Sequence, residues 1–113
     1  MSQHDPLGSL HDMLDFARKA VRFCQGKSQL DLEQDEVLQL AVARAIELIG
    51  EAASRVPLDV RKQHAVIPWP DIIATRNRLI HGYDRVDLGI VWATVEVDLP
   101  PLIEMLRRAL GEI

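Results

Sequence analysis

Cysteine is nearly absent from this chain: Cys24 is the only one among 113 residues. A single thiol excludes an internal disulfide and any zinc site built from several cysteines, so a reducing cytoplasm is the expected setting. Long apolar runs are missing too, since no stretch approaches the roughly 20 residues that a membrane-spanning helix needs. The N-terminus lacks a charged region followed by an apolar one. We therefore expect no signal peptide and no membrane association.

Strand signals are also missing, because β-branched residues do not alternate and apolar residues recur at steps of three and four. This spacing predicts helices over residues 7–25, from about 31 to 55, from 71 to about 82, and from 88 onward behind an Asp87 N-cap, with a short helix or turn over 57–65. The prolines at 100 and 101 either kink the last helix or start a new one at Asp98. The expected fold is an all-α bundle of four to five helices forming one domain over residues 1–113.

The buried sides of these helices follow from the same spacing. The expected inner side of the first helix is formed by Leu10, Leu14, Ala17, Val21 and Cys24, and that of the last by Ile90, Val91, Val95, Leu99, Leu102, Met105 and Leu106. In the second helix the expected inner side follows Val37, Leu40, Ala41, Arg44, Leu48 and Ala52, widened by Ile46 and Ile49. Gly50 stands in mid-helix, where glycine costs about 1 kcal/mol against alanine. We therefore expect Gly50 to permit a close helix approach, within the bundle or across a dimer.

The charge is unevenly distributed. The net charge is −4, which argues against broad binding of nucleic acid. Residues 55–85 nevertheless hold six Lys/Arg against three Asp/Glu. This local excess is either scatter or the basic lining of a site.

The chemistry is concentrated in the run Arg76-Asn77-Arg78-Leu79-Ile80-His81-Gly82-Tyr83. Histidine exchanges protons near neutral pH, and arginine binds phosphate bidentately while keeping its charge. Together they suit RNA cleavage without a metal or other cofactor, since the ribose 2′-OH already lies beside the scissile phosphate. The spacing alone also allows purely structural roles: His81 as a helix cap, Arg78 on a solvated face and Tyr83 in packing.

Helical geometry separates the two strongest candidates. Asn77 and Arg78 lie four and three residues before His81 and share its face of a helix. Arg76 lies five residues before His81, which is about 140° around a regular helix. This offset favours a composite site, with two copies of the segment facing each other across the cleft of a two-fold homodimer.

The run resembles the R-x4-H-x-Y signature of HEPN-domain toxins of the HepT-like family. Further segments match in order: Ala45-Ile46-Glu47-Leu48-Ile49-Gly50-Glu51-Ala52, Ile67-Pro68-Trp69, Val86-Asp87, Val91-Trp92 and Asp98-Leu99-Pro100. The resemblance covers about residues 40–103, and the first 35 residues match only as a helix of suitable length.

The resemblance implies a homodimeric HEPN fold and the toxin of a type VII (HEPN/MNT) toxin–antitoxin system, a metal-independent endoribonuclease. It implies Arg76 and His81 as catalytic residues and Asn77 as an orienting or phosphate-contacting residue. We expect Arg78 to contribute to substrate binding. The implied partner is a minimal nucleotidyltransferase antitoxin that transfers AMP to Tyr83.

Two alternative functions of other classes stay open. The chain is alternatively a non-catalytic helical module that binds and orients the nucleotidyltransferase, or a plain structural dimer. Glu47 and Glu51 have the spacing of paired carboxylates, but no second carboxylate–histidine pair completes a metal site. Glu51 is instead a candidate to support an active-site arginine.

Overall fold

A computed structural model of the chain describes residues 5–79 and 86–113, and their regular structure is helical throughout. The helices are α1 (Pro6–Phe23), α2 (Gln29–Gln34), α3 (Glu36–Ser54), α4 (Leu58–Gln63), α5 (Trp69–Leu79), α6 (Leu88–Ala93), the π-helical turn η1 (Thr94–Asp98) and α7 (Leu99–Ala109). Four of them, α1, α3, α5 and α7, have 11 residues or more. This confirms the all-α bundle of four main helices.

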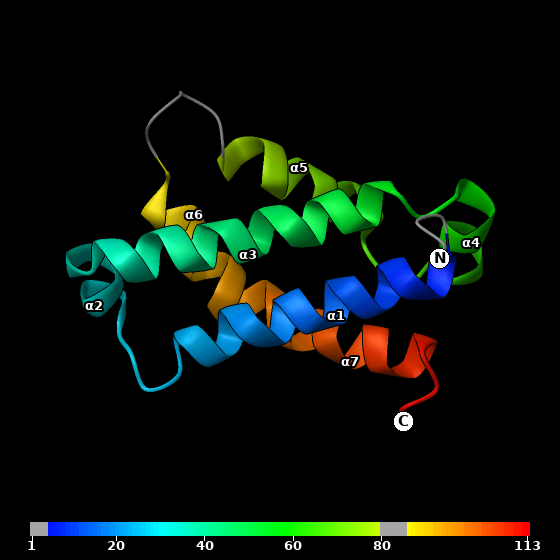
Figure 1. Ribbon diagram of the computed structural model, residues 1–113, viewed down its shortest axis with the longest axis horizontal. Helices are drawn as coiled ribbons and strands as arrows, with labels where there is room; N and C mark the ends of the chain where they lie inside the picture. Colours follow the sequence, from blue (N-terminus) through cyan, green and yellow to red (C-terminus); the bar gives the residue numbers. More distant parts are fainter. Residues whose placement is uncertain (1–4, 80–85) are drawn as a thin grey trace.

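Helices α1 and α3 lie side by side at the centre of the bundle, with α5 beside α3 and α7 beside α1 (Figure 1). Helix α3 packs on α1 along one side and on α5 along another, and α7 packs on α1. Helices α5 and α7 do not pack closely on each other. The bundle is therefore left open between α5 and α7. Among the described helices, none is both long and apolar enough to cross a bilayer.

Side-chain caps set where several helices begin. Asp5 accepts a hydrogen bond from the Leu7 amide at 3.0 Å, and Asp87 accepts one from the Ile90 amide at 3.1 Å. Ser28 and Asp31 form a reciprocal capping box, and Asp35 caps the next helix through the Leu38 amide at 3.0 Å. The single helix predicted from about residue 31 to 55 is therefore two helices, because Asp35 leaves helical geometry to cap α3.

The core lies between α1, α3 and the arm formed by α6, η1 and α7. From α1 it takes Leu10, Met13, Leu14, Ala17, Ala20 and the adjoining Cys24, and from the C-terminal arm Val91, Val95, Leu99, Leu102 and Leu106. Most residues predicted for the inner sides of the first and last helices are buried here, and three of them, Val21, Ile90 and Met105, are half-buried.

The inner side of α3 was predicted wrongly at its N-terminal half. Val37 and Leu40 are 78% and 62% exposed, whereas Leu38, Val42, Ala45 and Ile49 are buried. The buried side is displaced because α1 and α5 cover α3 from two directions. Two neighbouring apolar side chains, Val37 and Leu40, therefore remain exposed on the outer face of α3.

The two prolines begin α7, and the chain does not break before them. Pro100 and Pro101 occupy the first turn of α7, directly after η1. Since neither proline has an amide hydrogen, the carbonyls one turn earlier lose their usual partners, and the wider π turn lies at this place. Asp98 keeps helical dihedrals and its side chain does not cap α7, so the chain stays helical through the π turn and the predicted alternative of a new helix started at Asp98 is wrong.

Candidate active site

Helix α5 carries the first part of the candidate motif and is anchored at both ends. At its start Trp69 is buried, and its Nε1 donates to the carbonyls of Arg61 and His64, both at 3.2 Å. Near its other end Leu79 is fully buried. Trp69 therefore has a packing role, and the residues between 69 and 79 are held in a fixed orientation on α3.

Arg76 crosses α3 at Gly50. A Cβ atom built on Gly50 would lie 2.6 Å from the Cβ, 2.8 Å from the Cδ and 3.0 Å from the Cγ of Arg76. Such distances are shorter than van der Waals contact allows, so only glycine at position 50 leaves room for this side chain. The close approach expected of Gly50 is thus within the bundle, and the arginine stem lies flat on α3.

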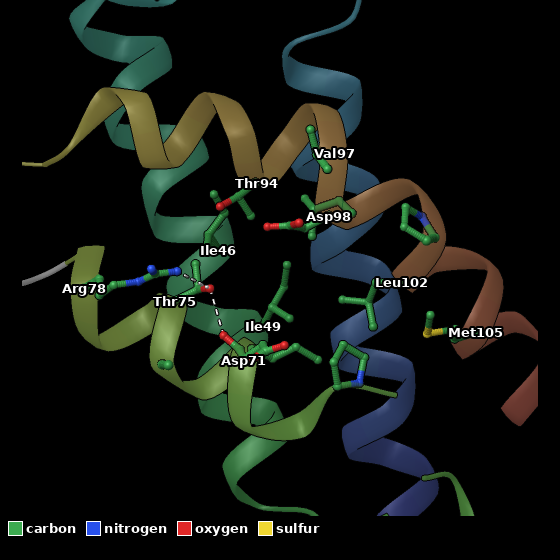
Figure 2. Close-up of a pocket in the computed structure, with 15 residues that line it drawn as sticks. Ile46, Ile49, Asp71, Thr75, Arg78, Thr94, Val97, Asp98, Leu102 and Met105 are labelled. Carbon is green, nitrogen blue, oxygen red and sulfur yellow. Dashed lines mark hydrogen bonds between the residues drawn. The ribbon is translucent and has the colours of Figure 1, made fainter. Parts of the chain in front are cut away.

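Asn77 and Arg78 leave α5 in other directions than Arg76. At 100° per residue, Arg78 lies about 200° around the helix from Arg76, on the side that faces the C-terminal arm. Its Nη2 donates to Thr75 Oγ1 at 3.3 Å, and Thr75 Oγ1 donates to the Asp71 carbonyl at 2.8 Å (Figure 2). Asn77 is exposed and lies between them, about 100° around the helix from each. The sequence run is therefore divided between two flanks of α5.

Glu51 pairs with Arg44 on the outer face of α3. Nη1 of Arg44 lies 3.1 Å from a carboxylate oxygen of Glu47 and 3.3 Å from one of Glu51. Among the described residues, Arg44 is the cation that pairs with these two glutamates. That Glu51 supports an active-site arginine stays a prediction. Within the same part of the chain, no group of three His, Cys, Asp or Glu side chains is placed to hold a metal ion.

His81 and Tyr83 lie outside the described residues, as does the predicted end of this helix near Gly82. Their roles and the 140° relation between Arg76 and His81 remain predictions. The described part of the motif is Arg76 to Leu79.

Arg61 has a structural role that the sequence did not single out. Its Nε donates to the Val56 carbonyl at 2.9 Å, and its Nη2 lies 3.3 Å from the carbonyls of Ala53 and Ser54. The guanidinium thus caps the last carbonyls of α3, a common use of basic residues at helix ends. One of the six cations between residues 55 and 85 is therefore engaged in the fold.

Comparison with known proteins gives a consistent picture. The family model "Ribonuclease HepT-like" matches residues 13–109. A Thermococcus cleftensis protein named "Probable ribonuclease HepT" is 43% identical over 77 residues, which are 66% of this chain and 70% of that protein. A "Putative RNase" of Caldanaerobacter subterraneus is 32% identical over 105 residues, 93% of this chain and 94% of its own length. A "Putative RNase" of Methanocaldococcus jannaschii is 31% identical over 102 residues, which are 90% of this chain and 94% of that protein.

No solved structure matches the chain at a significant level. The family match spans every described helix from within α1 to the end of α7 and includes the whole Arg76–Tyr83 run. The predicted resemblance and enzyme class are thereby confirmed: this chain belongs to the HepT-like ribonuclease family.

Proposed function

We propose that the chain is the toxin of a type VII toxin–antitoxin pair, a cytoplasmic endoribonuclease that needs no metal or other cofactor. The whole of residues 1–113 would act as one HEPN domain. The observation that carries the proposal is the match of the HepT-like family across the fold and the motif. Arg76 and His81 are its catalytic residues, and Asn77 and Arg78 bind the RNA.

The reaction follows from the chemistry of RNA. One histidine accepts the proton of the ribose 2′-OH as that oxygen attacks phosphorus. A second histidine donates a proton to the departing 5′-oxygen. The arginines stabilise the negative charge that builds up on the phosphoryl oxygens. The products are a 2′,3′-cyclic phosphate and a 5′-hydroxyl. One chain supplies a single His81, so two chains meeting at a cleft supply both proton-transfer groups.

The outer face of α3 is the surface we assign to that dimer. It exposes Val37 and Leu40 beside the Arg44–Glu47–Glu51 ion pairs. Neighbouring exposed apolar side chains favour burial against a partner. A two-fold axis brings like surfaces together, and a surface holding both signs of charge can pair with its own copy. Asn77 is exposed on α5, which packs directly on α3, so a partner that covers the outer face of α3 would lie near the motif.

Control by the antitoxin is proposed to act at Tyr83. A minimal nucleotidyltransferase would transfer AMP to the Tyr83 hydroxyl, placing a phosphate and a bulky base where RNA has to bind. The added phosphate would pair with an arginine of the motif. If so, the mass of the co-expressed chain rises by one or more AMP units, and Tyr83→Phe abolishes the increase. An increase that persists in Tyr83→Phe places the modification elsewhere.

The alternative is a non-catalytic module that binds and orients the nucleotidyltransferase. The net charge of −4 favours it, and the engagement of Arg61 in capping α3 reduces the cations left for RNA. Under this reading His81 and Tyr83 serve as contacts and modification target only.

Incubation of the purified chain with RNA in EDTA separates the two functions. The enzyme predicts cleavage with cyclic-phosphate ends that falls about 10² to 10⁴-fold in His81→Ala. His11→Ala, at an exposed position on α1, is the matched control and should cleave like the parent. A strict requirement for Mg²⁺, or products with 5′-phosphates, would overturn the proposed chemistry.

A further inference from the structure

A cavity of about 610 Å³ lies where the bundle is open, between α5 and the C-terminal arm. Its floor comes from Ile46 and Ile49 of α3, and its walls include Ile72, Leu102 and Met105 (Figure 2). Apolar cavities of about 300–1,000 Å³ with a few polar groups are typical of small-ligand sites. The cavity is thus large enough for a nucleobase and lined by side chains that suit a flat ring.

The hydrogen bonds already formed within the protein decide which polar groups at the cavity can donate to a ligand. Thr75 Oγ1 donates to the Asp71 carbonyl at 2.8 Å, and Thr94 Oγ1 donates to the Ile90 carbonyl at 2.7 Å. Each threonine hydroxyl has one proton, so neither can donate to a ligand. Among the described side chains that line the cavity, donation to a ligand therefore falls to Arg78.

Acceptors at the cavity are two carboxylates. Asp98 points into the cavity and does not cap α7, although it occupies the N-cap position (Figure 2). Asp71 lines the same cavity. Among residues 5–79 and 86–113, the ion pairs found involve neither carboxylate. The cavity thus combines apolar walls, acceptors for N–H groups and one guanidinium that can bind phosphate.

We propose that this cavity binds one base of single-stranded RNA that carries an exocyclic amino group, with the adjoining phosphate at Arg78. The inference rests on the proposed ribonuclease function and makes Asp98 a specificity-determining residue for it. Adenine, cytosine and guanine offer an amino group to the carboxylate. Uracil presents a carbonyl oxygen where cytosine has its amino group, and two facing acceptors repel.

The position of the cavity fits a subsite separate from the reacting phosphate. Arg78 and Arg76 point in directions about 160° apart around α5. A strand that crosses the C-terminal end of α5 can thus place one phosphate on the Arg76 flank and turn a neighbouring base toward Arg78. Single-stranded RNA is commonly read through such unstacked bases.

Methionine methyl NMR can locate the base directly. The chain has three methionines; Met105 lines the cavity, and Met13 is fully buried in the core. Titration with CMP should shift the Met105 methyl signal through the ring current of the stacked base and leave that of Met13 unchanged. UMP should produce a clearly smaller shift at equal concentration.

Specificity is tested with 2′-O-methyl oligouridylate dodecamers that carry a central cytosine or none, since they bind without being cleaved. We expect the parent to bind the cytosine-containing strand about tenfold more tightly, as a hydrogen bond to a charged group allows. Asp98→Asn should remove this preference. Glu96→Gln has the same charge change on the same π turn but lines a different cavity beside Cys24, so it should retain the preference.

The outcomes separate the subsite from the ribonuclease function. Equal binding of both strands by the parent, or no Met105 shift with CMP, overturns the subsite even if RNA is cleaved. Base preference that depends on Asp98 in a chain without cleavage supports the subsite and removes the ribonuclease proposal. An Asp98→Asn chain that keeps its base preference but changes its oligomeric state shows a protein contact and overturns the subsite.

Discussion

Gly50 on α3 lies directly beneath the side chain of Arg76 on α5, with no room for even a methyl group between them. Because the Cβ of Arg76 is itself in the way, rotation of the arginine side chain cannot relieve a clash. Any larger residue at position 50 has to displace α5 from α3. The candidate catalytic arginine is therefore positioned by the absence of a side chain on the neighbouring helix.

We expect Gly50→Ala to lower both stability and activity. Overpacking of this kind typically costs about 1–3 kcal/mol, more than the gain in helix propensity from alanine. Gly8→Ala is the matched control, since its Cβ would lie 3.6 Å from the nearest atoms, and it should be neutral or slightly stabilising. Chemical denaturation and RNA cleavage measure the two effects. A Gly50→Ala chain as stable and active as the parent would contradict this account of the contact.

The outer face of α3 should control self-association. Leu40→Glu introduces a charge into the proposed interface, so we expect monomers and loss of cleavage with the fold retained. Leu58→Glu alters a leucine on α4 that is 69% exposed, compared with 62% for Leu40, and should remain dimeric. Sedimentation at micromolar concentration compares them. A dimeric Leu40→Glu chain would place the interface elsewhere.

Arg61 should contribute more to the free energy of unfolding than the adjacent Lys62. Its guanidinium caps three carbonyls at the end of α3. Hydrogen bonds that involve a charged group contribute about 1.5–3 kcal/mol, so we expect Arg61→Met to cost about 2 kcal/mol in the free energy of unfolding. The exposed Lys62→Met control should stay within about 0.5 kcal/mol of the parent. Equal losses in urea unfolding would argue against the capping role.

The C-terminal ion pairs should make stability depend on pH. Hydrogen bonding from Arg18, at 2.9 Å, holds the pKa of the Glu112 carboxyl below its ordinary value. A lowered pKa in the folded state gives a contribution that is present above the ordinary pKa and lost as pH falls through the lowered one. Glu112→Gln should therefore be less stable than the parent at neutral pH, and the difference should vanish in acid. Glu104→Gln, on the exposed side of α7, should show no such pattern.

Helix positions were predictable where local signals agree. The apolar spacing of α1 and α7, the Asp87 cap and the packing of Trp69 all follow from short-range patterns. The break at Asp35 had a local signal as well, since Ser28 and Asp35 can each cap one of two successive helices. The apolar spacing alone does not separate two helices joined at one capping residue, so a single helix was predicted there.

The features that could not be predicted depend on which helices pack against each other. Val37 and Leu40 are as apolar as the core residues of α3, and only the placement of α1 and α5 decides that they stay exposed. The division of Arg76 and Arg78 between two flanks follows in the same way from the side of α5 that faces α3. The contact of Gly50 with Arg76 joins residues 26 positions apart, beyond the reach of periodicity.

The central claim is a ribonuclease site shared by two chains, and subunit mixing tests it most directly. His81→Ala chains are expected to be dimeric and nearly inactive toward RNA in EDTA. When they are mixed and exchanged with parent chains, each heterodimer holds a single intact His81, whereas the proposed reaction uses two. We expect cleavage to fall in proportion to the parent homodimers counted by native mass spectrometry, because a heterodimer lacks one of the two proton-transfer groups. Heterodimers that retain half the cleavage of the parent dimer would contradict the composite site.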